Sequence, residues 1–281
     1  MKKIELTAGT VEYEDAGGPG PVVVFVHGVT IDHTVWRHVV KDLVPEYRCI
    51  TPLLPLGAHR IPMRPDADLS LRSMGLLIGE FLEKLDLTDV TVVQNDWGGV
   101  QVLIANGDSG RIGSLVLTPC EAFDNYPPGL SGAGLTAAAA IPGGLALLMQ
   151  GLRFTALRRA PGSWGWMSKR PVPKSVMDGW FGPATTDKRI RRDLRKYGRS
   201  APPKETLLNW ANRNSSFGKP VTILWAPEDK LMPREHGRRL NEVYPNSRLK
   251  EIDDSYTLMP EDRPDAIIAA VRELVDTGTP T

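Results

Sequence analysis

Cysteine, long apolar runs and net charge are all scarce in this chain. Only 2 of its 281 residues are cysteine, too few for a disulfide framework or a zinc site, so we expect a reducing, cytoplasmic setting. No stretch approaches the roughly 18 apolar residues of a membrane span, and the first residues contain no apolar signal core. The 34 Lys and Arg nearly balance the 33 Asp and Glu, which argues against a general nucleic-acid or membrane-surface binder.

The chain does contain an alternation of strand-like and helix-like segments. Residues 22–26 form a continuous apolar run, typical of a strand buried on both faces, and residues 71–87 space their apolar side chains at helical period. Further strands are expected at 48–56, 89–93, 115–117, 221–225 and 249–252, with helices from about 98, 233 and 260. Strands that alternate with helices pair in parallel, so the sequence predicts an α/β fold with a mostly parallel central sheet and helices on both faces.

Between residues 123 and 218 the alternation stops. This segment has no convincing strand and is predicted to be a helical cap, inserted into an α/β core formed by residues 1–122 and 219–281. Its charge is uneven, because residues 150–204 carry 14 Lys and Arg against 3 Asp, a net charge of +11 that leaves −10 for the rest of the chain. Two interpretations stay open: solvated faces of surface helices, or a field that attracts an anionic substrate.

The segment VVQNDWGG, residues 92–99, places Asp96 at a turn between a β-rich run and two glycines that open a helix. A tight strand–turn–helix of this kind is typical of a nucleophile elbow, which raises one side chain into a pocket at the carboxyl end of a strand. Gly98 and Gly99 let the helix approach the strand closely. The same aspartate is equally consistent with a helix N-cap, which needs no catalytic role.

A second segment favours the catalytic interpretation. The apolar run of residues 22–26 leads directly into His27-Gly28 and then VTIDHTVWR, upstream of the acidic turn. His-Gly followed by Asp-Trp-Gly-Gly, with a cap behind them, resembles the α/β-hydrolase superfamily and, more narrowly, its haloalkane-dehalogenase and epoxide-hydrolase branch. The resemblance extends from about Val22 to the last helix. It implies an α/β-hydrolase fold with an inserted helical cap, and hydrolysis of a carbon–halogen, epoxide or related bond in a small organic substrate.

The resemblance also implies roles for individual residues. Asp96 would attack an electrophilic carbon and form an alkyl ester. The backbone N–H groups of Val29 and Trp97 would form the oxyanion hole, and the Trp97 indole N–H would donate to a departing halide. Asp229, four residues before a proline, matches the acid that normally orients a histidine, and Glu121 is an alternative. Both acids are also compatible with ordinary turn or cap-hinge positions.

One residue that the resemblance requires is absent. The family's catalytic histidine stands seven residues before a proline that follows the last strand. Counting back from Pro264 leads to Thr257, and no histidine follows His236. Threonine cannot accept a proton from water near neutral pH, so the step that hydrolyses the ester has no evident base.

Four explanations of this absence stay open. A histidine from elsewhere, namely His27, His33 or His59, would reach the site. Asp96 would itself act as a general base, with its pKa raised by burial and by Asp229. The reaction would be a non-hydrolytic one, such as an elimination or a cyclisation, or the protein would be a catalytically silent ligand binder.

The substrate pocket is expected to be walled by aromatic side chains, most of them from the cap. The candidates are Trp164, Trp166, Trp180 and, beside Thr257, Tyr256. No metal site or nucleotide cradle is indicated, since His, Cys and carboxylate residues do not cluster at ligand spacing and no G-x-G-x-x-G pattern occurs. We therefore expect no cofactor, and a small-molecule partner rather than nucleic acid or a membrane. The oligomeric state stays open.

Overall fold

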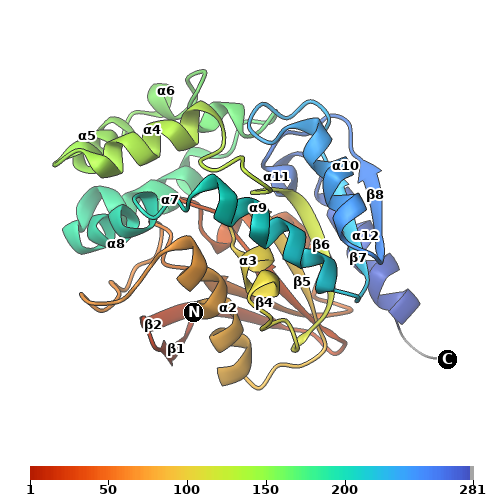
Figure 1. The fold of residues 1–281 in the computed structure, drawn as a ribbon. Helices are drawn as coiled ribbons and strands as arrows, with labels where there is room; N and C mark the ends of the chain where they lie inside the picture. Colours follow the sequence, from red (N-terminus) through yellow and green to blue (C-terminus); the bar gives the residue numbers. More distant parts are fainter. Residues whose placement is uncertain (279–281) are drawn as a thin grey trace.

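An eight-stranded sheet forms the centre of the protein (Figure 1), in the order β1-β2-β4-β3-β5-β6-β7-β8. The structure, a computed structural model, describes residues 1–278. Strand β2 pairs antiparallel with β1 and β4, and all other neighbours pair in parallel, so the predicted mostly parallel sheet is confirmed. The strands are β1 (Lys2–Leu6), β2 (Gly9–Gly17), β3 (Val22–Val26), β4 (Arg48–Leu53), β5 (Val90–Asp96), β6 (Ile112–Cys120), β7 (Val221–Trp225) and β8 (Ser247–Glu251).

The central parallel strands are apolar because helices cover both faces of the sheet. All seven residues of β5 are buried, as are four of the five residues of β3. Strand β5 continues three residues past the predicted end at Val93 and stops at Asp96, which puts this carboxylate at the carboxyl edge of the sheet.

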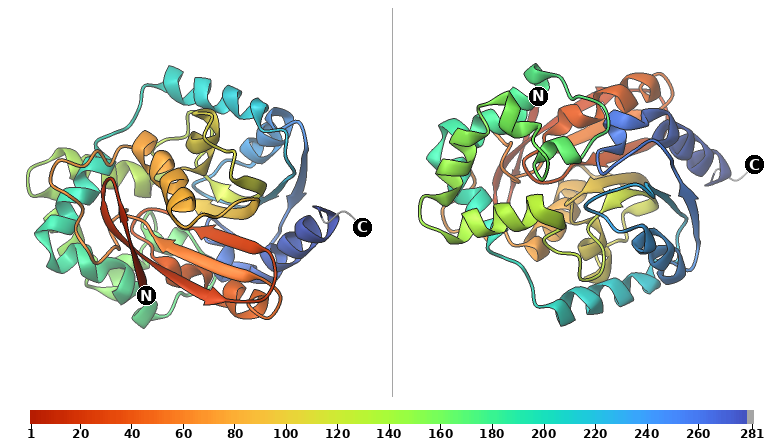
Figure 2. Two further views of the ribbon diagram at one scale, coloured as in Figure 1. Left: turned by 90° about the horizontal axis from the view of Figure 1, so that it is seen from below. Right: turned by 90° about the horizontal axis from the view of Figure 1, so that it is seen from above.

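Two groups of helices cover the sheet (Figure 2). Helices α1, α11 and α12 pack together on one face, and α2, α3, α9 and α10 lie on the other. The predicted helix 71–87 is confirmed as α2, which Ser70 caps by accepting from the Ser73 N–H. These helices are α1 (Arg37–Leu43), α2 (Leu71–Lys84), α3 (Val100–Ala105), α9 (Lys204–Arg213), α10 (Arg234–Val243), α11 (Met259–Asp262) and α12 (Pro264–Gly278). In the described residues, no helix is long and apolar enough to cross a membrane.

Between β6 and β7 the chain is helical, and its described residues contain no strand. Helices α4, α5, α7 and α8 pack on one another at one end of the sheet, whereas α9 runs beside the sheet and packs on α3 (Figures 1 and 2). The remaining elements are α4 (Gly129–Ala140), α5 (Gly144–Gly151), α6 (Thr155–Arg158), α7 (Lys174–Thr186), α8 (Lys188–Gly198) and the 3-10 turns η1 (His33–Trp36), η2 (Trp164–Trp166) and η3 (Asn214–Ser216). The division of the chain at 122/123 and 218/219 stays a prediction.

The N-terminal hairpin of β1 and β2 was not predicted. Strand β2 buries Val11 and Tyr13 against the body, whereas Glu12 is partly exposed and Glu14 is exposed. A strand with one solvated face carries charges at every second position, so it lacks the continuous apolar run that marks the central strands.

Candidate active site

Asp96 stands at the tip of a strained turn between β5 and α3. Its φ of +55° lies in the left-handed region, which a residue with a side chain rarely adopts. The Gly98 N–H donates to the Asp96 carbonyl oxygen at 2.9 Å and closes the turn. Strain of this kind persists where the surroundings over-determine it, and it is common at functional sites.

Glycines around the turn allow its close packing. A Cβ on Gly28, just after β3, would lie 1.9 Å from Asp96 Oδ2, and a Cβ on Gly98 would lie 2.7 Å from Val26 Cγ1. Gly99 has a φ of +85° and faces Gly75 of α2, where an added Cβ would lie 2.9 Å from the Gly99 carbonyl oxygen. The His-Gly and Gly-Gly pairs of the sequence are therefore required by the contact between two strand ends and a helix.

The Asp96 carboxylate is almost fully buried, with 1% of the residue exposed. The Val29 N–H donates to its Oδ2 atom at 3.2 Å. Burial raises the pKa of Asp96 to about 7, and the nearby Asp229 adds to this, while the backbone N–H groups of Trp97 and Val29 oppose it. The two N–H groups predicted to form an oxyanion hole thus both act on this carboxylate.

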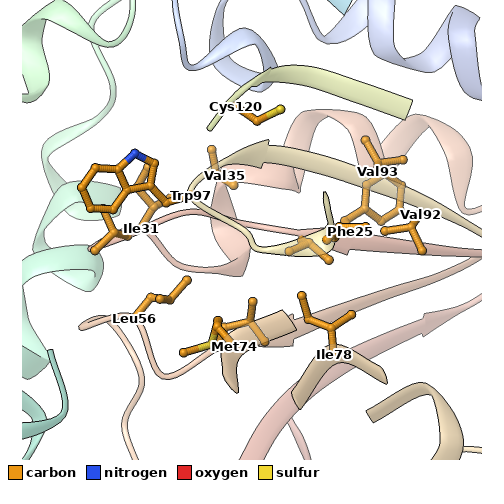
Figure 3. Packing of buried hydrophobic residues seen from close by; sticks show 14 of the residues in the cluster. Phe25, Ile31, Val35, Leu56, Met74, Ile78, Val92, Val93, Trp97 and Cys120 are labelled. Carbon is orange, nitrogen blue, oxygen red and sulfur yellow. The ribbon is translucent and has the colours of Figure 1, made fainter. Parts of the chain in front are cut away.

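A cavity adjoins Asp96 and is covered by the cap. It is lined by Val29, Asp96, Trp97, Pro128, Ser131, Gly132, Leu135, Trp164, Met167 and Leu231. The Trp97 indole N–H is buried and has no hydrogen-bond partner among the described residues, although the ring packs on Tyr126 with 4.7 Å between centroids. Trp97 lies at the cap-facing end of the core, and Val92 and Val93 lie further along the sheet (Figure 3). The mostly apolar lining of this cavity therefore includes one buried carboxylate, Asp96, and one residue with an unused buried donor, Trp97.

Asp229 follows β7 and pairs with Thr257. The Thr257 hydroxyl donates to Asp229 Oδ1 at 2.8 Å, and the Leu231 N–H donates to the same oxygen at 2.8 Å. The other oxygen, Oδ2, is buried and has no hydrogen-bond partner in the described part of the chain. Burial raises the pKa of Asp229 to about 6, against the lowering effect of the Leu231 N–H and the Thr257 hydroxyl.

Buried polar side chains support the turn from behind. Glu121 accepts from the Gly99 N–H at 2.7 Å and from Gln94 Nε2 at 2.8 Å, and Gln94 Oε1 accepts from the Val100 N–H. Burial raises the pKa of Glu121 to about 8. The Asn95 amide donates to the Thr257 carbonyl oxygen at 2.7 Å and so connects the two halves of the site.

The model of a known family, described as an alpha/beta hydrolase family, matches residues 23–270. The chain belongs to this family. The match covers both strand ends that form the turn, the cap, and the segments that carry Asp229 and Thr257.

Relatives of this α/β hydrolase include enzymes. A haloalkane dehalogenase from Mesorhizobium japonicum is 34% identical over 97 residues, which span 34% of this chain and 30% of that relative. A cis-3-alkyl-4-alkyloxetan-2-one decarboxylase from Xanthomonas campestris is 24% identical over 98% of this chain and 95% of its own length. The crystal structure of a haloalkane dehalogenase from Bradyrhizobium elkani has a TM-score of 0.79 at 16% identity, covers 99% of this chain and 97% of its own, and shares the fold. The chain is thus an enzyme of the hydrolase-fold type with dehalogenase-like relatives.

The three candidate histidines of this α/β hydrolase lie outside the cavity lining. His27 accepts from the Leu54 N–H through Nε2 and donates from Nδ1 to the Gly28 carbonyl oxygen, both at 2.9 Å, and burial lowers its pKa to about 4. His59 is held between the Gly57 N–H and Asp193 Oδ2, and burial lowers its pKa as well. His33 lies beside Glu14 and Asp32, at 3.7 and 3.9 Å. Two of the three rings are fully bonded elsewhere.

Of the aromatic candidates, only Trp164 lines the cavity. Trp180 is buried, and its indole N–H donates to Thr34 Oγ1 at 3.1 Å. Trp166 and Tyr256 both contact the Lys230 ammonium, at 5.4 and 4.6 Å from the ring centres. Glu121 lies behind the turn and lines a separate cavity.

Several cavity residues were missed by sequence reasoning. Ser131, Gly132 and Leu135 come from α4, and Met167 and Leu231 come from loops. Small and apolar residues give no chemical signal, so only the folded arrangement identifies them. The polar pair Gln94-Asn95 within an apolar strand was the one available signal for the supporting network. Within residues 1–278, no group of three or more His, Cys, Asp or Glu lies where it could hold a metal ion.

Proposed function

We propose that this α/β hydrolase uses Asp96 as a nucleophile against an electrophilic carbon of a small apolar substrate. The observation that carries the proposal is that Asp96 and Trp97 line one cavity: the Asp96 carboxylate has one oxygen on the Val29 N–H, and the buried Trp97 indole N–H has no partner among the described residues. A buried donor without a partner is costly, and an anionic leaving group would satisfy it. The mostly apolar lining of the cavity suits a small apolar molecule.

For a bromoalkane the first step balances as follows. An oxygen of the Asp96 carboxylate forms a bond to carbon, the carbon–bromine bond breaks, and bromide leaves with the electron pair toward the Trp97 N–H. The product is an alkyl ester of Asp96. The names of the dehalogenase relatives support this class of substrate.

Hydrolysis of that ester is proposed to be slow. This hydrolysis needs a base that takes a proton from the attacking water. Thr257 occupies the place beside Asp229 where the family resemblance puts a histidine. The Thr257 hydroxyl hydrogen is already directed at Asp229 Oδ1. With no imidazole at this position, the ester would accumulate or turn over slowly.

A second candidate is acid–base catalysis without an ester. It is favoured by the Asp96 pKa of about 7, since a carboxyl group that titrates near neutral pH exchanges protons efficiently. The relative from Xanthomonas campestris is a decarboxylase by name, and decarboxylation is a non-hydrolytic reaction.

One experiment separates the two candidates. The protein is incubated with 1-bromobutane, 1,2-epoxybutane or a small ester, and the intact mass, released bromide and organic products are measured together. The nucleophile proposal predicts bromide release and a mass gain of one alkyl group, both lost in Asp96→Asn. Product formation that depends on Asp96 with no ester detectable at any time would instead favour acid–base catalysis.

Glu121→Gln is the matched control. It also neutralises a buried carboxyl group near the turn, yet Glu121 lies outside the Asp96 cavity. Adduct formation that survives Glu121→Gln and disappears in Asp96→Asn assigns the chemistry to Asp96. If neither product nor adduct appears with any compound, and Asp96→Asn leaves ligand affinity unchanged, the nucleophile role is excluded.

A further inference from the structure

Exposed large apolar side chains gather in one part of the cap. Apart from Met1, every large hydrophobic residue that is at least half exposed in the described chain lies on α4, α5, α6 or their ends. These residues are Leu130, Ile141, Leu147, Phe154 and Leu157, of which Leu147 is 78% exposed. We call these five residues the apolar cap surface. Large exposed apolar surface on a folded protein marks an interaction site.

Two of the helices that carry this surface, α4 and α5, contain no charged residue. Residues 125–152 contain no charged side chain, and α4 and α5 consist of small and aliphatic residues on their outer as well as inner faces. The inner face of α4 is already occupied, because Ser131, Gly132 and Leu135 line the Asp96 cavity. A helix that is hydrophobic all round is normally covered on both sides. The outer face of the α4 and α5 pair lies at the edge of the molecule (Figure 1).

Positive charge borders the apolar cap surface. Arg153 and Arg159 are exposed and flank Phe154 and Leu157, and α8, which packs against α4 and α5, adds further basic side chains. Half of the basic residues between 150 and 204 form no ion pair with a carboxylate in the described part of the chain: Arg153, Arg159, Lys188, Arg191, Arg195, Lys196 and Arg199. Several of these donate to backbone carbonyl oxygens instead, which leaves their charge uncompensated.

We propose that the cap docks on an anionic lipid surface, with the apolar cap surface inserted at the headgroup level and the surrounding basic residues on the lipid phosphates. Apolar side chains and nearby Lys and Arg act together in binding to anionic membranes. Docking would place α4 between the lipid and the Asp96 cavity. The inference is independent of the role of Asp96, and it replaces the expectation of no membrane-surface partner, which rested on a net charge that averages a basic cap with an acidic body.

A second copy of the chain is a poorer occupant. A twofold contact would bring the same surface of each copy together, and with it two segments of net charge +11. Like charges that face each other across an interface oppose association. Anionic headgroups match both the apolar centre and the basic border.

Vesicle co-sedimentation tests the proposal with the full chain. The probes are phosphatidylcholine vesicles, with and without about one third phosphatidylglycerol, at low and high salt. We expect binding to the anionic vesicles that weakens at high salt and is at least about tenfold weaker on phosphatidylcholine alone. The variants Leu147→Ser/Phe154→Ser and Arg153→Gln/Arg159→Gln should each weaken binding about tenfold or more.

The matched control is Lys41→Gln/Arg213→Gln, which removes the same charge from exposed positions outside the apolar cap surface and its basic border. It should keep binding within about twofold of the parent, because its side chains do not face the lipid. Absence of binding at low salt, or an equal loss in the control, overturns the proposal. So does a dimer in light scattering that Leu147→Ser/Phe154→Ser abolishes, since that result assigns the surface to a second copy.

Discussion

Three carboxyl groups are buried in and around the site, and none of them forms an ion pair within residues 1–278. Asp96, Glu121 and Asp229 accept only from backbone N–H groups, an amide and a hydroxyl, and burial raises the pKa of each. Buried carboxylates that serve structure alone are usually paired with Lys or Arg. Here the protein keeps acids that titrate close to neutral pH, a property that catalytic groups need.

The rate of Asp96 alkylation should follow its ionisation. Only the carboxylate form attacks carbon, so the rate should rise about tenfold per pH unit below about pH 7 and level off above it. The measurement is the initial rate of bromide release and of adduct mass with 1-bromobutane between pH 5 and 9. A rate that is already maximal at pH 5 would contradict the raised pKa. Spontaneous hydrolysis of the bromoalkane, measured with Asp96→Asn, is the background to subtract.

Thr257→His should restore the missing second step. The new imidazole would lie beside Asp229, which accepts the Thr257 hydroxyl at 2.8 Å, and would act as general base on water. We expect ester hydrolysis to accelerate about 100-fold or more, measured as decay of the adduct mass and release of alcohol.

Two further variants make this result interpretable. Thr257→Val removes the hydroxyl without adding a base and should show no gain. Adding Asp229→Asn to Thr257→His should reduce the gain, because the imidazole loses its orienting carboxylate. A Thr257→His protein that forms the adduct at the parent rate yet hydrolyses it no faster would show that the pocket is not built for this chemistry.

At the scale of elements, the turn depends on three segments that meet without room for side chains. The end of β3, the β5–α3 turn and helix α2 are in contact through Gly28, Gly98, Gly99 and Gly75. Asp96 can hold its φ of +55° because these neighbours fix it from all sides.

Gly28→Ala should therefore damage the site. The added methyl group would lie 1.9 Å from Asp96 Oδ2, on a short side chain that has nowhere to move. We expect a loss of about 1–3 kcal/mol in the free energy of unfolding, by urea denaturation, and a fall of about 100-fold or more in adduct formation. Gly110→Ala is the control, since nothing lies within 4 Å of its added Cβ. Unchanged alkylation in Gly28→Ala would show that the turn tolerates displacement.

The elements differ in how far the sequence predicts them. Strands β3 and β5 were recognisable because burial on both faces requires continuous apolar runs. The Asp96 turn was recognisable because its close packing leaves no room for a Cβ and so requires glycines. The β1–β2 hairpin was not, since its charged outer face hides the strand. The cap's contribution to the cavity was also beyond prediction, because Gly132 and Leu135 acquire their place only through the packing of α4 over the turn.

The surroundings of the histidines were also beyond prediction from the sequence. The sequence offered His27, His33 and His59 as substitutes for the missing base, with His33 and His59 as the main candidates, but His27 and His59 are held in place. In the folded chain both nitrogens of each ring are engaged, His27 by two backbone groups and His59 by Gly57 and Asp193. These partners come from segments up to 134 residues away, so the sequence could not show them.

For the whole molecule, buried acids and buried histidines change the stability of the folded state with pH in opposite directions. The three raised acids stabilise the folded state most below their unfolded pKa values, and this contribution is lost as the pH rises through the folded values of about 6 to 8. Burial lowers the pKa of His27, His33, His59 and His236, so these residues destabilise the folded state as the pH falls below about 6.5. Stability should thus decline toward both acid and alkaline pH.

Asp96→Asn isolates one of these contributions. Asparagine resembles the protonated acid and stays neutral, so the variant should avoid the loss that wild type suffers between pH 5 and 8. From a folded pKa of about 7, we expect the advantage of Asp96→Asn in the free energy of unfolding to be about 2–3 kcal/mol larger at pH 8 than at pH 5, measured by urea denaturation. Asp66→Asn, at an exposed position, should show the same difference from wild type at both pH values. If Asp96→Asn also shows a constant difference, Asp96 ionises normally in the folded protein, and the acid–base candidate loses its supporting observation.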